Sequence, residues 1–362
     1  MTELSVIVPT FNERENVHEL VKHLSEALAG ISWEVVFVDD DSPDGTAETI
    51  RELARKDARV RCVQRVGRRG LSSATIEGML STSSPYLAVM DGDLQHDEAL
   101  LPRMLEVLRT EPVDIVVGSR YIEGGGLGDW AKSRALISRW AGRLSRVVVR
   151  ADLADPMSGF FMIRRECVHR SVPHLSGVGF KILLDLFASS STPLRFKELP
   201  FHFRARHAGE SKLDSQVAWE YIILLLDKMV GHIVPVRFVA FSIVGSLGVV
   251  MHMLILTIAY KGLGFNFVPS QAFAAMVAMT FNFLLNNVLT YRDRRLRGWR
   301  LIRGWITFNL ACSIGAIANV GVASYLFSTR SDFWIVSAVA GILVGAVWNY
   351  ALTQLYTWNA RQ

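Results

Sequence analysis

The stretch YLAVMDGDLQHD, residues 86–97, decides the fold of the N-terminal half of this 362-residue chain. It opens on an apolar run, which is typical of a short strand buried on both faces. Asp91 and Asp93 follow directly, and Gly92 between them allows the backbone to approach a ligand closely. Ligands of open α/β sheets bind at the carboxyl ends of the strands. Two carboxylates at such an end predict a site for a divalent cation that holds a diphosphate.

Strand and helix patterns alternate at short spacing on both sides of this stretch. We expect strands at 5–8, 33–38, 60–63 and 114–117, and helices at 13–29, at 47–57 and from about Ser72. This alternation predicts a parallel sheet covered by helices on both faces. A second acidic cluster, at 39–41, also ends a strand, so we expect both clusters to meet in one crevice. A solvated turn is the alternative for either cluster alone.

Basic residues gather in three further segments. GRRGLSSA (67–74) precedes a helix, and a helix N-terminus with basic neighbours attracts phosphate. ARHAGESKL (205–213) reads as a loop able to close over a diphosphate. Four arginines spaced along one face of a helix, near 139–150, indicate a helix on an anionic membrane surface, with an ordinary solvated helix as the alternative. For His96, beside the acidic turn, we favour a solvent-facing position over a ligand contact.

Beyond about residue 230 the chain consists of long uncharged tracts. They predict four membrane spans, at about 238–260, 268–290, 304–328 and 333–357. The connection 291–303 has six arginines and one aspartate, which places it on the cytoplasmic side. Both termini are then cytoplasmic too, and no cleaved signal peptide is recognised. We therefore expect a cytoplasmic domain at 1–213, an interfacial amphipathic helix at 214–234 and a transmembrane domain at 235–362.

The two predicted helix pairs look like copies of one another. At an offset of 67 residues, the glycine-containing segment 245–248 lines up with the last four residues of 311–315, and 281–283 matches 348–350. The repeat is parallel, because the first and third helices run in the same direction. Asparagines inside the tracts are costly in lipid and are expected to bond between helices.

The totals limit the classes of partner. A net charge of +5 fits an anionic leaflet or a phosphorylated substrate, and nucleic acid is not expected. The three cysteines have no metal-binding spacing and are expected to be free.

Seven motifs occur in an order that resembles the dolichol-phosphate mannose synthases, which are inverting family 2 glycosyltransferases. They are VPTFNERENV (8–17), VDDDSPDGT (38–46), GLSSA (70–74), MDGDLQH (90–96), GSRY (118–121), DPMSGFF (155–161) and AGESKL (208–213). The resemblance covers roughly residues 3–215, and the tail resembles a GtrA-like four-helix module. It implies an α/β fold of the GT-A type, Rossmann-like and mostly parallel, joined to an all-α transmembrane domain.

The resemblance also implies roles for individual residues. The residues implied to bind the nucleotide sugar are Pro9, Phe11, Glu13, Val38, Asp40, Asp91, Gly92, Asp93, Arg206 and Lys212. The residues implied to bind the lipid phosphate are Arg120, Arg134 and Ser158. Asp91, Asp93 and Gln95 would hold Mg²⁺ or Mn²⁺, and the catalytic set is Asp91, Asp93 and Arg120. The chain departs from the family at Phe11, where tyrosine is usual, and at Arg69, where lysine is common.

The implied reaction is inverting transfer of mannose from GDP-mannose to a polyprenyl (dolichyl-type) phosphate in the lipid bilayer of the cytoplasmic membrane. UDP-glucose, or another nucleotide sugar, is the alternative donor. A carrier that flips a lipid-linked sugar is the alternative of another class. The oligomeric state is left open.

Overall fold

The computed structural model describes residues 2–126, 149, 151–176, 181–204, 221, 223–228, 234–291, 294–329 and 334–358, without the side chains of 318–320, 322–324, 326–329 and 334–342. The chain forms two compact units, Met1–Met229 and Val230–Gln362. This division separates the predicted cytoplasmic and transmembrane halves.

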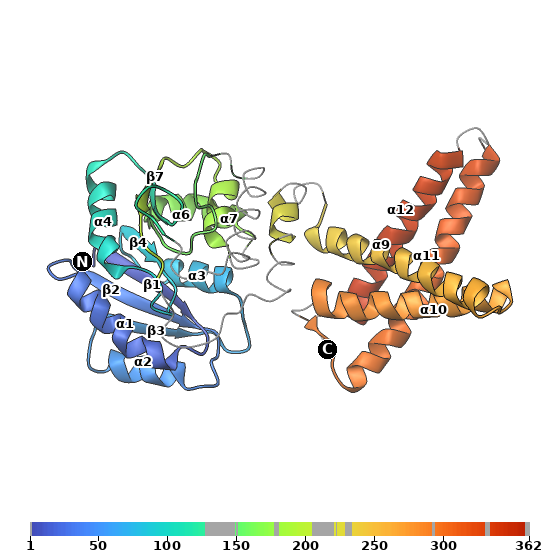
Figure 1. Ribbon diagram of the computed structural model, residues 1–362, viewed down its shortest axis with the longest axis horizontal. Helices are drawn as coiled ribbons and strands as arrows, with labels where there is room; N and C mark the ends of the chain where they lie inside the picture. The colour runs from blue at the N-terminus through green and yellow to red at the C-terminus, as the bar shows by residue number, and fades with distance from the viewer. Residues whose placement is uncertain are drawn as a thin grey trace. The chain divides into compact units, whose positions relative to one another are not determined.

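The strands described in the first unit form one sheet in the order β3-β2-β1-β4-β6-β5-β7 (Figure 1). They are β1 (Leu4–Thr10), β2 (Trp33–Asp39), β3 (Val60–Gln64), β4 (Tyr86–Val89), β5 (Ile115–Ser119), β6 (Phe161–Arg164) and β7 (Phe196–Pro200). Neighbours run parallel except that β6 is antiparallel to β4 and to β5. The mostly parallel α/β architecture predicted from the sequence is confirmed, and β6 and β7 are the strands that the sequence did not predict.

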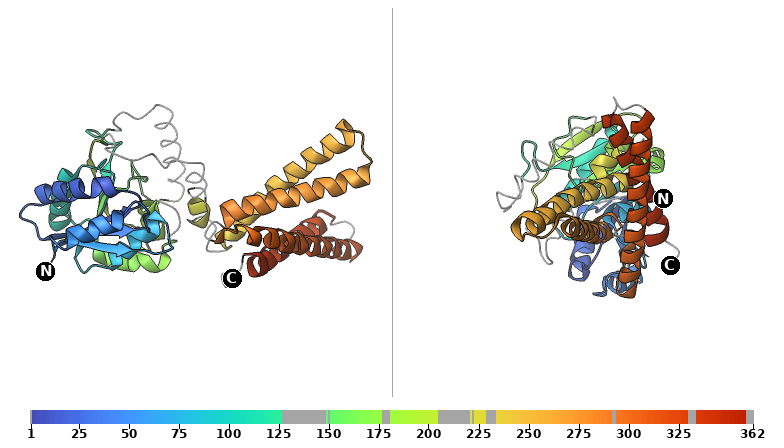
Figure 2. Two further views of the ribbon diagram at one scale, coloured as in Figure 1. Left: turned by 90° about the horizontal axis from the view of Figure 1, so that it is seen from below. Right: turned by 90° about the vertical axis from the view of Figure 1, so that its right-hand side faces the viewer.

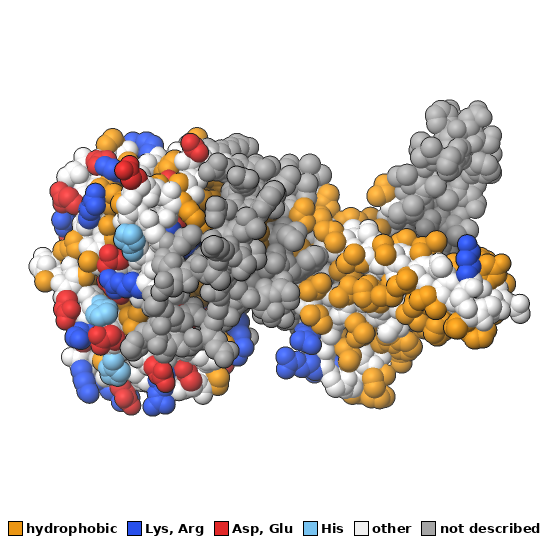
Figure 3. All heavy atoms as spheres, viewed as in Figure 1, with side chains coloured by type: hydrophobic (Ala, Val, Ile, Leu, Met, Phe, Trp, Pro, Cys, Tyr) orange, Lys and Arg blue, Asp and Glu red, His pale blue; other side chains and the backbone are white. Residues whose placement is uncertain are grey.

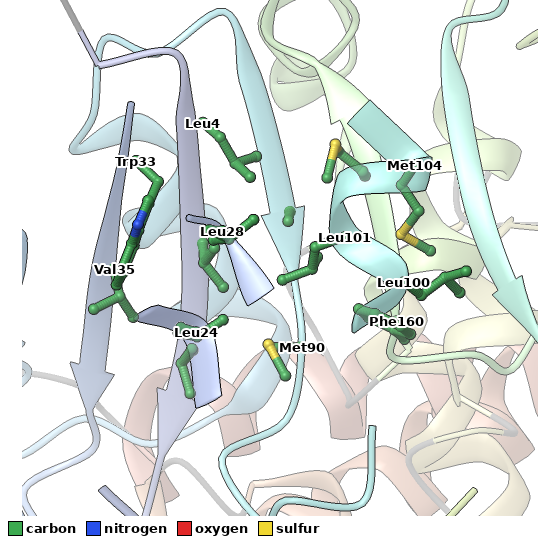
Figure 4. Close-up of a cluster of buried hydrophobic side chains, with 14 of the residues drawn as sticks. Leu4, Leu24, Leu28, Trp33, Val35, Met90, Leu100, Leu101, Met104 and Phe160 are labelled. Carbon is green, nitrogen blue, oxygen red and sulfur yellow. The ribbon is translucent and has the colours of Figure 1, made fainter. Parts of the chain in front are cut away.

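Helices cover both faces of this sheet, as expected. They are α1 (Arg14–Ala27), α2 (Thr46–Ala54), α3 (Leu71–Leu80), α4 (Leu101–Thr110), α6 (Arg165–Ser171) and α7 (Ile182–Ser189). Side chains alternate along β1, so Val6 and Val8 join one buried cluster with α1, α2 and α4, while Ile7 joins the other with α3, α6 and α7. Figure 4 shows the first cluster, in which Leu24 of α1 and Leu28, the residue after that helix, are drawn with Trp33 and Val35 of β2.

The end of the first unit contains part of the expected interfacial helix. Residues 223–228 are helical, and Leu224 and Leu225 are buried in the cluster beneath α7. Lys228 forms an ion pair of 2.6 Å with the buried Asp185 of α7. This stretch therefore packs on the sheet domain, whereas an interfacial position for the rest of 214–234 stays a prediction.

The second unit is helical. Its described helices are α9 (Val236–Thr257), α10 (Phe267–Leu285), α11 (Trp299–Thr329) and α12 (Trp334–Leu352). Figure 2 shows α9 and α10 side by side as an antiparallel pair. Within the described residues, two stretches are long and apolar enough to cross a membrane, Val236–Gly262 with a mean hydropathy of 2.2 and Phe267–Thr290 with 1.6. Helices α11 and α12 occupy the third and fourth predicted tracts, and their membrane crossing stays a prediction.

Apolar side chains cover much of the described part of this unit on the face that Figure 3 shows. In the most apolar window of the first stretch only 22% of the residues are buried, and in that of the second only 28%. Apolar side chains left exposed over such a length need a lipid environment. Together with the sequence, this identifies a membrane protein.

The predicted internal repeat is present in the helices. Single π-helical turns occur at Asn286–Thr290 and at Thr353–Thr357, which are 67 residues apart. The residues after these turns, Tyr291 and Trp358, stack on each other with ring centroids 4.1 Å apart. Equivalent positions of the two hairpins therefore meet in one buried aromatic cluster.

Candidate active site

The carboxyl ends of β1, β2 and β4 lie at one edge of the sheet. Parallel pairing sets Thr10 beside Asp39 and Ile7 beside Val89, so the loops after these strands begin at the same edge. Asp39 fixes the edge, because its carboxylate accepts hydrogen bonds from the Thr10 hydroxyl at 3.2 Å and from the Ser42 backbone N–H at 2.9 Å. The two acidic clusters, one after β2 and the other after β4, therefore lie at the same edge of the sheet, as predicted.

The residues expected at the nucleoside follow β1 and β2. They are Pro9, Phe11, Glu13, Val38 and Asp40. Val38 is fully buried in the core. The Glu13 carboxylate accepts a hydrogen bond from the Asn16 amide at 2.8 Å. Pro9 and Phe11 are half-buried, which leaves part of each accessible from the edge.

Asp40 connects β2 to the basic segment 67–74. Its carboxylate accepts hydrogen bonds from the Gly70 backbone N–H at 2.6 Å and from the Arg65 guanidinium at 2.7 Å. Burial raises the pKa of Asp40, and these two partners oppose the rise. Arg65 is 3% exposed and also donates to the Ser73 hydroxyl at 2.7 Å. Sequence reasoning missed Arg65, because a single arginine after a strand has no motif to mark it.

The turn after β4 holds the expected metal ligands Asp91, Asp93 and Gln95. Asp93 is 6% exposed, and its Oδ1 accepts the Gln95 backbone N–H at 3.2 Å. Asp91 is half-buried, and this burial raises the pKa of its carboxyl; His96 opposes the rise and Asp93 adds to it. Two carboxylates that repel one another are a donor set that fits a hard divalent cation.

This donor set is small. Among the residues that the structure describes, no three side chains of the His, Cys, Asp or Glu type are gathered at one point to hold a metal ion. A cation at Asp91 and Asp93 therefore needs further oxygen ligands, such as the Gln95 amide, a diphosphate or water.

Two glycines bring neighbouring loops close to this turn. A Cβ on Gly92 would lie 3.3 Å from the Thr10 methyl group and 3.4 Å from Val8, so the glycine is explained by packing against β1. A Cβ on Gly159 would lie 3.2 Å from Asp91 Oδ2. The DPMSGFF loop (155–161) therefore lies directly against the acidic turn.

That loop carries the partner of Arg120. The Asp155 carboxylate is fully buried and binds the Arg120 guanidinium in two places, at 2.7 and 2.8 Å. Ser158 is 3% exposed, and its hydroxyl donates to the Gly118 carbonyl at 2.7 Å. Two of the residues expected at the lipid phosphate, Arg120 and Ser158, are thus adjacent, and Ser158 is already hydrogen-bonded within the loop.

Lys181 is a site residue that the sequence did not reveal. Its Nζ donates to the carbonyl of Met157 at 3.0 Å. Burial and, next, the Arg120 charge lower the pKa of Lys181 to about 8, against the opposing effect of Asp91 and Asp155. Lys181 belongs to none of the seven motifs, and only the fold brings it to Arg120 and Asp91.

His96 is buried, so the expectation of a solvent-facing side chain was wrong. The residue is 2% exposed, and its ring stacks on Phe160 with centroids 5.0 Å apart and planes 11° apart. Phe201 and Phe203 meet the same ring edge-on, each with centroids 5.7 Å away. Burial lowers the pKa of His96. These phenylalanines lie far along the chain, which is why the sequence around His96 did not indicate its environment.

Several expected residues lie outside the described residues. They are Arg134, Arg206, Lys212 and the four arginines of the predicted amphipathic helix, Arg139, Arg143, Arg146 and Arg150. Their assignments stay predictions.

Comparison with known proteins agrees with this arrangement. Residues 5–171 match glycosyl transferase family 2, and residues 240–358 match the GtrA/DPMS transmembrane domain. A dolichol-phosphate mannosyltransferase of Pyrococcus furiosus is 35% identical over 361 residues, which cover 98% of this chain and 99% of that protein. An undecaprenyl-phosphate mannosyltransferase of Micrococcus luteus is 33% identical, with 60% of this chain and 90% of the relative covered.

Among solved structures, a similar chain is the glucosyl-3-phosphoglycerate synthase of Mycobacterium tuberculosis, in complex with Mn²⁺, uridine diphosphate and glucosyl-3-phosphoglycerate. Its TM-score is 0.47 at 18% sequence identity, with 63% of this chain and 80% of that chain covered.

The sheet, the acidic edge and the apolar helices define a membrane glycosyltransferase with a GT-A domain. More closely, the chain belongs to the dolichol-phosphate mannosyltransferase family, together with the full-length relative from Pyrococcus furiosus.

Proposed function

We propose that this enzyme transfers mannose from GDP-mannose to a polyprenyl phosphate of the dolichyl type, with inversion at the anomeric carbon. The observation that carries the proposal is the contact of Gly159 with Asp91. It sets the acidic turn, suited to a nucleotide diphosphate, against the loop whose Asp155 holds Arg120, suited to an acceptor phosphate. Two relatives of this chain are named for mannose transfer, one to dolichol phosphate and the other to undecaprenyl phosphate.

Asp91, Asp93 and Gln95 would hold the divalent cation, Mg²⁺ or Mn²⁺. When bound, such a cation supplies a Lewis acid that stabilises the charge of the leaving diphosphate. Arg206 and Lys212 are proposed to bind the same diphosphate through charge-assisted hydrogen bonds. Phe11, Asp40 and their neighbours Pro9, Glu13 and Val38 are proposed to surround the nucleoside.

The acceptor phosphate needs binding and orientation more than deprotonation. A phosphate monoester has a second pKa of about 6, so it is largely ionised at neutral pH, and no general base is assigned. Arg120 is held in one orientation by Asp155, and Lys181 adds a second cation nearby. Ser158 and Arg134 are proposed to complete the phosphate site. An acceptor oxygen that attacks opposite the diphosphate converts an α-linked donor into a β-linked lipid product.

The second unit is proposed to keep the enzyme at its lipid substrate. Four spans, with the arginine-rich connection 291–303 on the cytoplasmic side, place both termini and the GT-A domain in the cytoplasm. The polyprenyl chain stays in the bilayer, while its phosphate reaches the site from the membrane surface.

A donor comparison tests the proposal. The purified full-length enzyme, reconstituted in liposomes with a polyprenyl phosphate and Mg²⁺ or Mn²⁺, is given labelled GDP-mannose or UDP-glucose. We expect lipid-linked mannose from the first donor and little product from the second. Turnover of UDP-glucose without turnover of GDP-mannose would overturn the choice of donor.

The same liposomes separate an enzyme from a carrier of lipid-linked sugar. Asp93→Ala removes a carboxylate from the acidic turn and is expected to abolish synthesis. Asp57→Ala is a matched control, because Asp57 pairs with Arg59 before β3, at the opposite edge of the sheet. Undiminished synthesis by Asp93→Ala would exclude this site as the catalytic one.

A further inference from the structure

We propose that His96 is a positioning residue for Asp91, and that it acts as a neutral imidazole with its proton on Nε2. The inference rests on the proposed function, because it concerns the acidic turn at which the donor diphosphate and its cation would bind. It assigns a role to a side chain that contacts neither substrate.

The hydrogen bond at Nδ1 fixes the protonation state. The backbone N–H of Asp91 points at His96 Nδ1 with a separation of 3.1 Å. A backbone N–H can only donate, so Nδ1 must be the acceptor and carries no proton. The ring proton is therefore on Nε2, and a doubly protonated imidazolium would lose this bond.

The other nitrogen faces the side chain of the same aspartate. His96 Nε2 lies 3.8 Å from Asp91 Oδ2, which is beyond a direct hydrogen bond. The Nε2–H dipole is nevertheless close to the carboxylate and favours an orientation in which Oδ2 stays near the ring. One imidazole thus holds the backbone of Asp91 at Nδ1 and biases its carboxylate at Nε2.

The ring itself is held by aromatic neighbours. Phe160 stacks on one face, and Phe201 and Phe203 meet the ring edge-on. Such aromatic pairs stabilise the position of the ring beyond the burial of its area. A ring enclosed in this way cannot turn, so the positions of both nitrogens are set by packing.

The same cluster joins the parts of the site that come from distant segments. Phe203 lies under the Arg120 guanidinium, whose Cζ is 5.5 Å from the ring centroid. The next residue, Arg204, donates its backbone N–H to the Gln95 carbonyl at 2.9 Å and accepts from the Gln95 amide at 3.0 Å. Through Phe203, His96 therefore connects the acidic turn to Arg120, which is proposed to bind the acceptor phosphate. It also connects this turn to Arg204, the residue before the loop 205–213.

Three variants separate the parts played by the ring. His96→Phe keeps the aromatic stack and removes both nitrogens. His96→Asn places an acceptor where Nδ1 lies, and His96→Gln places an N–H donor where Nε2 lies. The control His169→Phe makes the same change on the exposed face of α6.

The readout is binding of Mn²⁺ to the full-length protein with GDP, measured by electron paramagnetic resonance, beside the melting temperature. We expect His96→Phe to weaken Mn²⁺ binding about 10-fold or more, as loss of a group that orients a metal ligand typically does. His96→Asn and His96→Gln should each recover part of the loss, and His169→Phe should bind like the wild type.

Two outcomes decide the matter. Wild-type Mn²⁺ affinity in His96→Phe, with or without a lower melting temperature, means that the ring only packs and overturns the inference. The same holds if His96→Phe does not fold and neither amide variant changes the affinity. Absence of Mn²⁺ binding by the wild-type protein with GDP would instead count against the proposed function.

Discussion

The guanidinium of Arg69 lies over the ring of Phe11, with its Cζ 4.2 Å from the ring centroid. These are the two positions at which the family resemblance led us to expect lysine and tyrosine. A planar guanidinium stacks on an aromatic ring as an ammonium does not. The two departures therefore form one contact, beside the residues proposed to surround the nucleoside.

This contact predicts coupled effects on nucleotide binding. A guanidinium held over a ring in this way has N–H donors that match the O6 and N7 acceptors of guanine. We expect Phe11→Leu and Arg69→Gln each to weaken GDP binding, and the double variant to lose less than the sum by about 0.5–1 kcal/mol. Isothermal titration with GDP gives the values. Arg68→Gln is the control, because Arg68 pairs with Glu77 instead; strictly additive losses would contradict the coupling.

The pair of Arg120 and Asp155 predicts a loss of stability when one member is neutralised. Asp155 is fully buried, and Arg120 is 9% exposed. Asp155→Asn leaves a buried cation without its counter-charge, which costs about 3–5 kcal/mol. We expect a clearly lower melting temperature and a higher KM for polyprenyl phosphate. A variant with the wild-type melting temperature would show that the pair is not buried as described.

An ion pair at the start of β5 predicts a dependence on acid. The hydrogen bond from the Arg195 guanidinium lowers the pKa of Asp114. A lowered folded-state pKa contributes stability above the unfolded value of about 3.9, and this contribution is lost as the pH falls through the folded-state value. Asp114→Asn should therefore be less stable than the wild type at pH 7, with a difference that shrinks below about pH 4. Thermal melts across this range measure it, and a constant difference would contradict the assignment.

The internal repeat predicts matched effects in its two hairpins. A Cβ on Gly248 would collide with the Asn282 side chain, and a Cβ on Gly315, 67 residues later, would collide with Asn349. Gly245, one turn away, has open space around it. We expect Gly248→Leu and Gly315→Leu to destabilise the membrane unit by about 1–3 kcal/mol, and Gly245→Leu to leave it nearly unchanged. Melting temperatures in detergent compare the three, and equal losses at 245 and 248 would refute the close packing.

The sequence predicted those parts of the site that local patterns determine. Apolar runs ending at Asp39 and at Met90 marked the strand ends, and the register of β1 with β2 and β4 then brought them together. The helix hairpins and their offset of 67 were likewise visible, because uncharged tracts and repeated glycine and asparagine positions are local features.

The parts that long-range packing determines were not predicted. Strand β6 pairs with β4 and β5 in an antiparallel sense, and a four-residue run has no local sign of its direction. Burial of His96 depends on Phe201 and Phe203, which become its neighbours only through the sheet. Lys181 likewise reaches the site by tertiary folding alone.

We propose that the acidic turn at Asp91 and Asp93 serves mannose transfer to a polyprenyl phosphate. The most direct test of this proposal is the single-turnover rate of lipid-linked mannose formation from GDP-mannose, in liposomes, by the wild type and by Asp93→Asn. We predict β-linked product from the wild type and a rate at least about 100-fold lower in the variant. Equal rates in the two proteins, or an α-linked lipid product, would contradict the account.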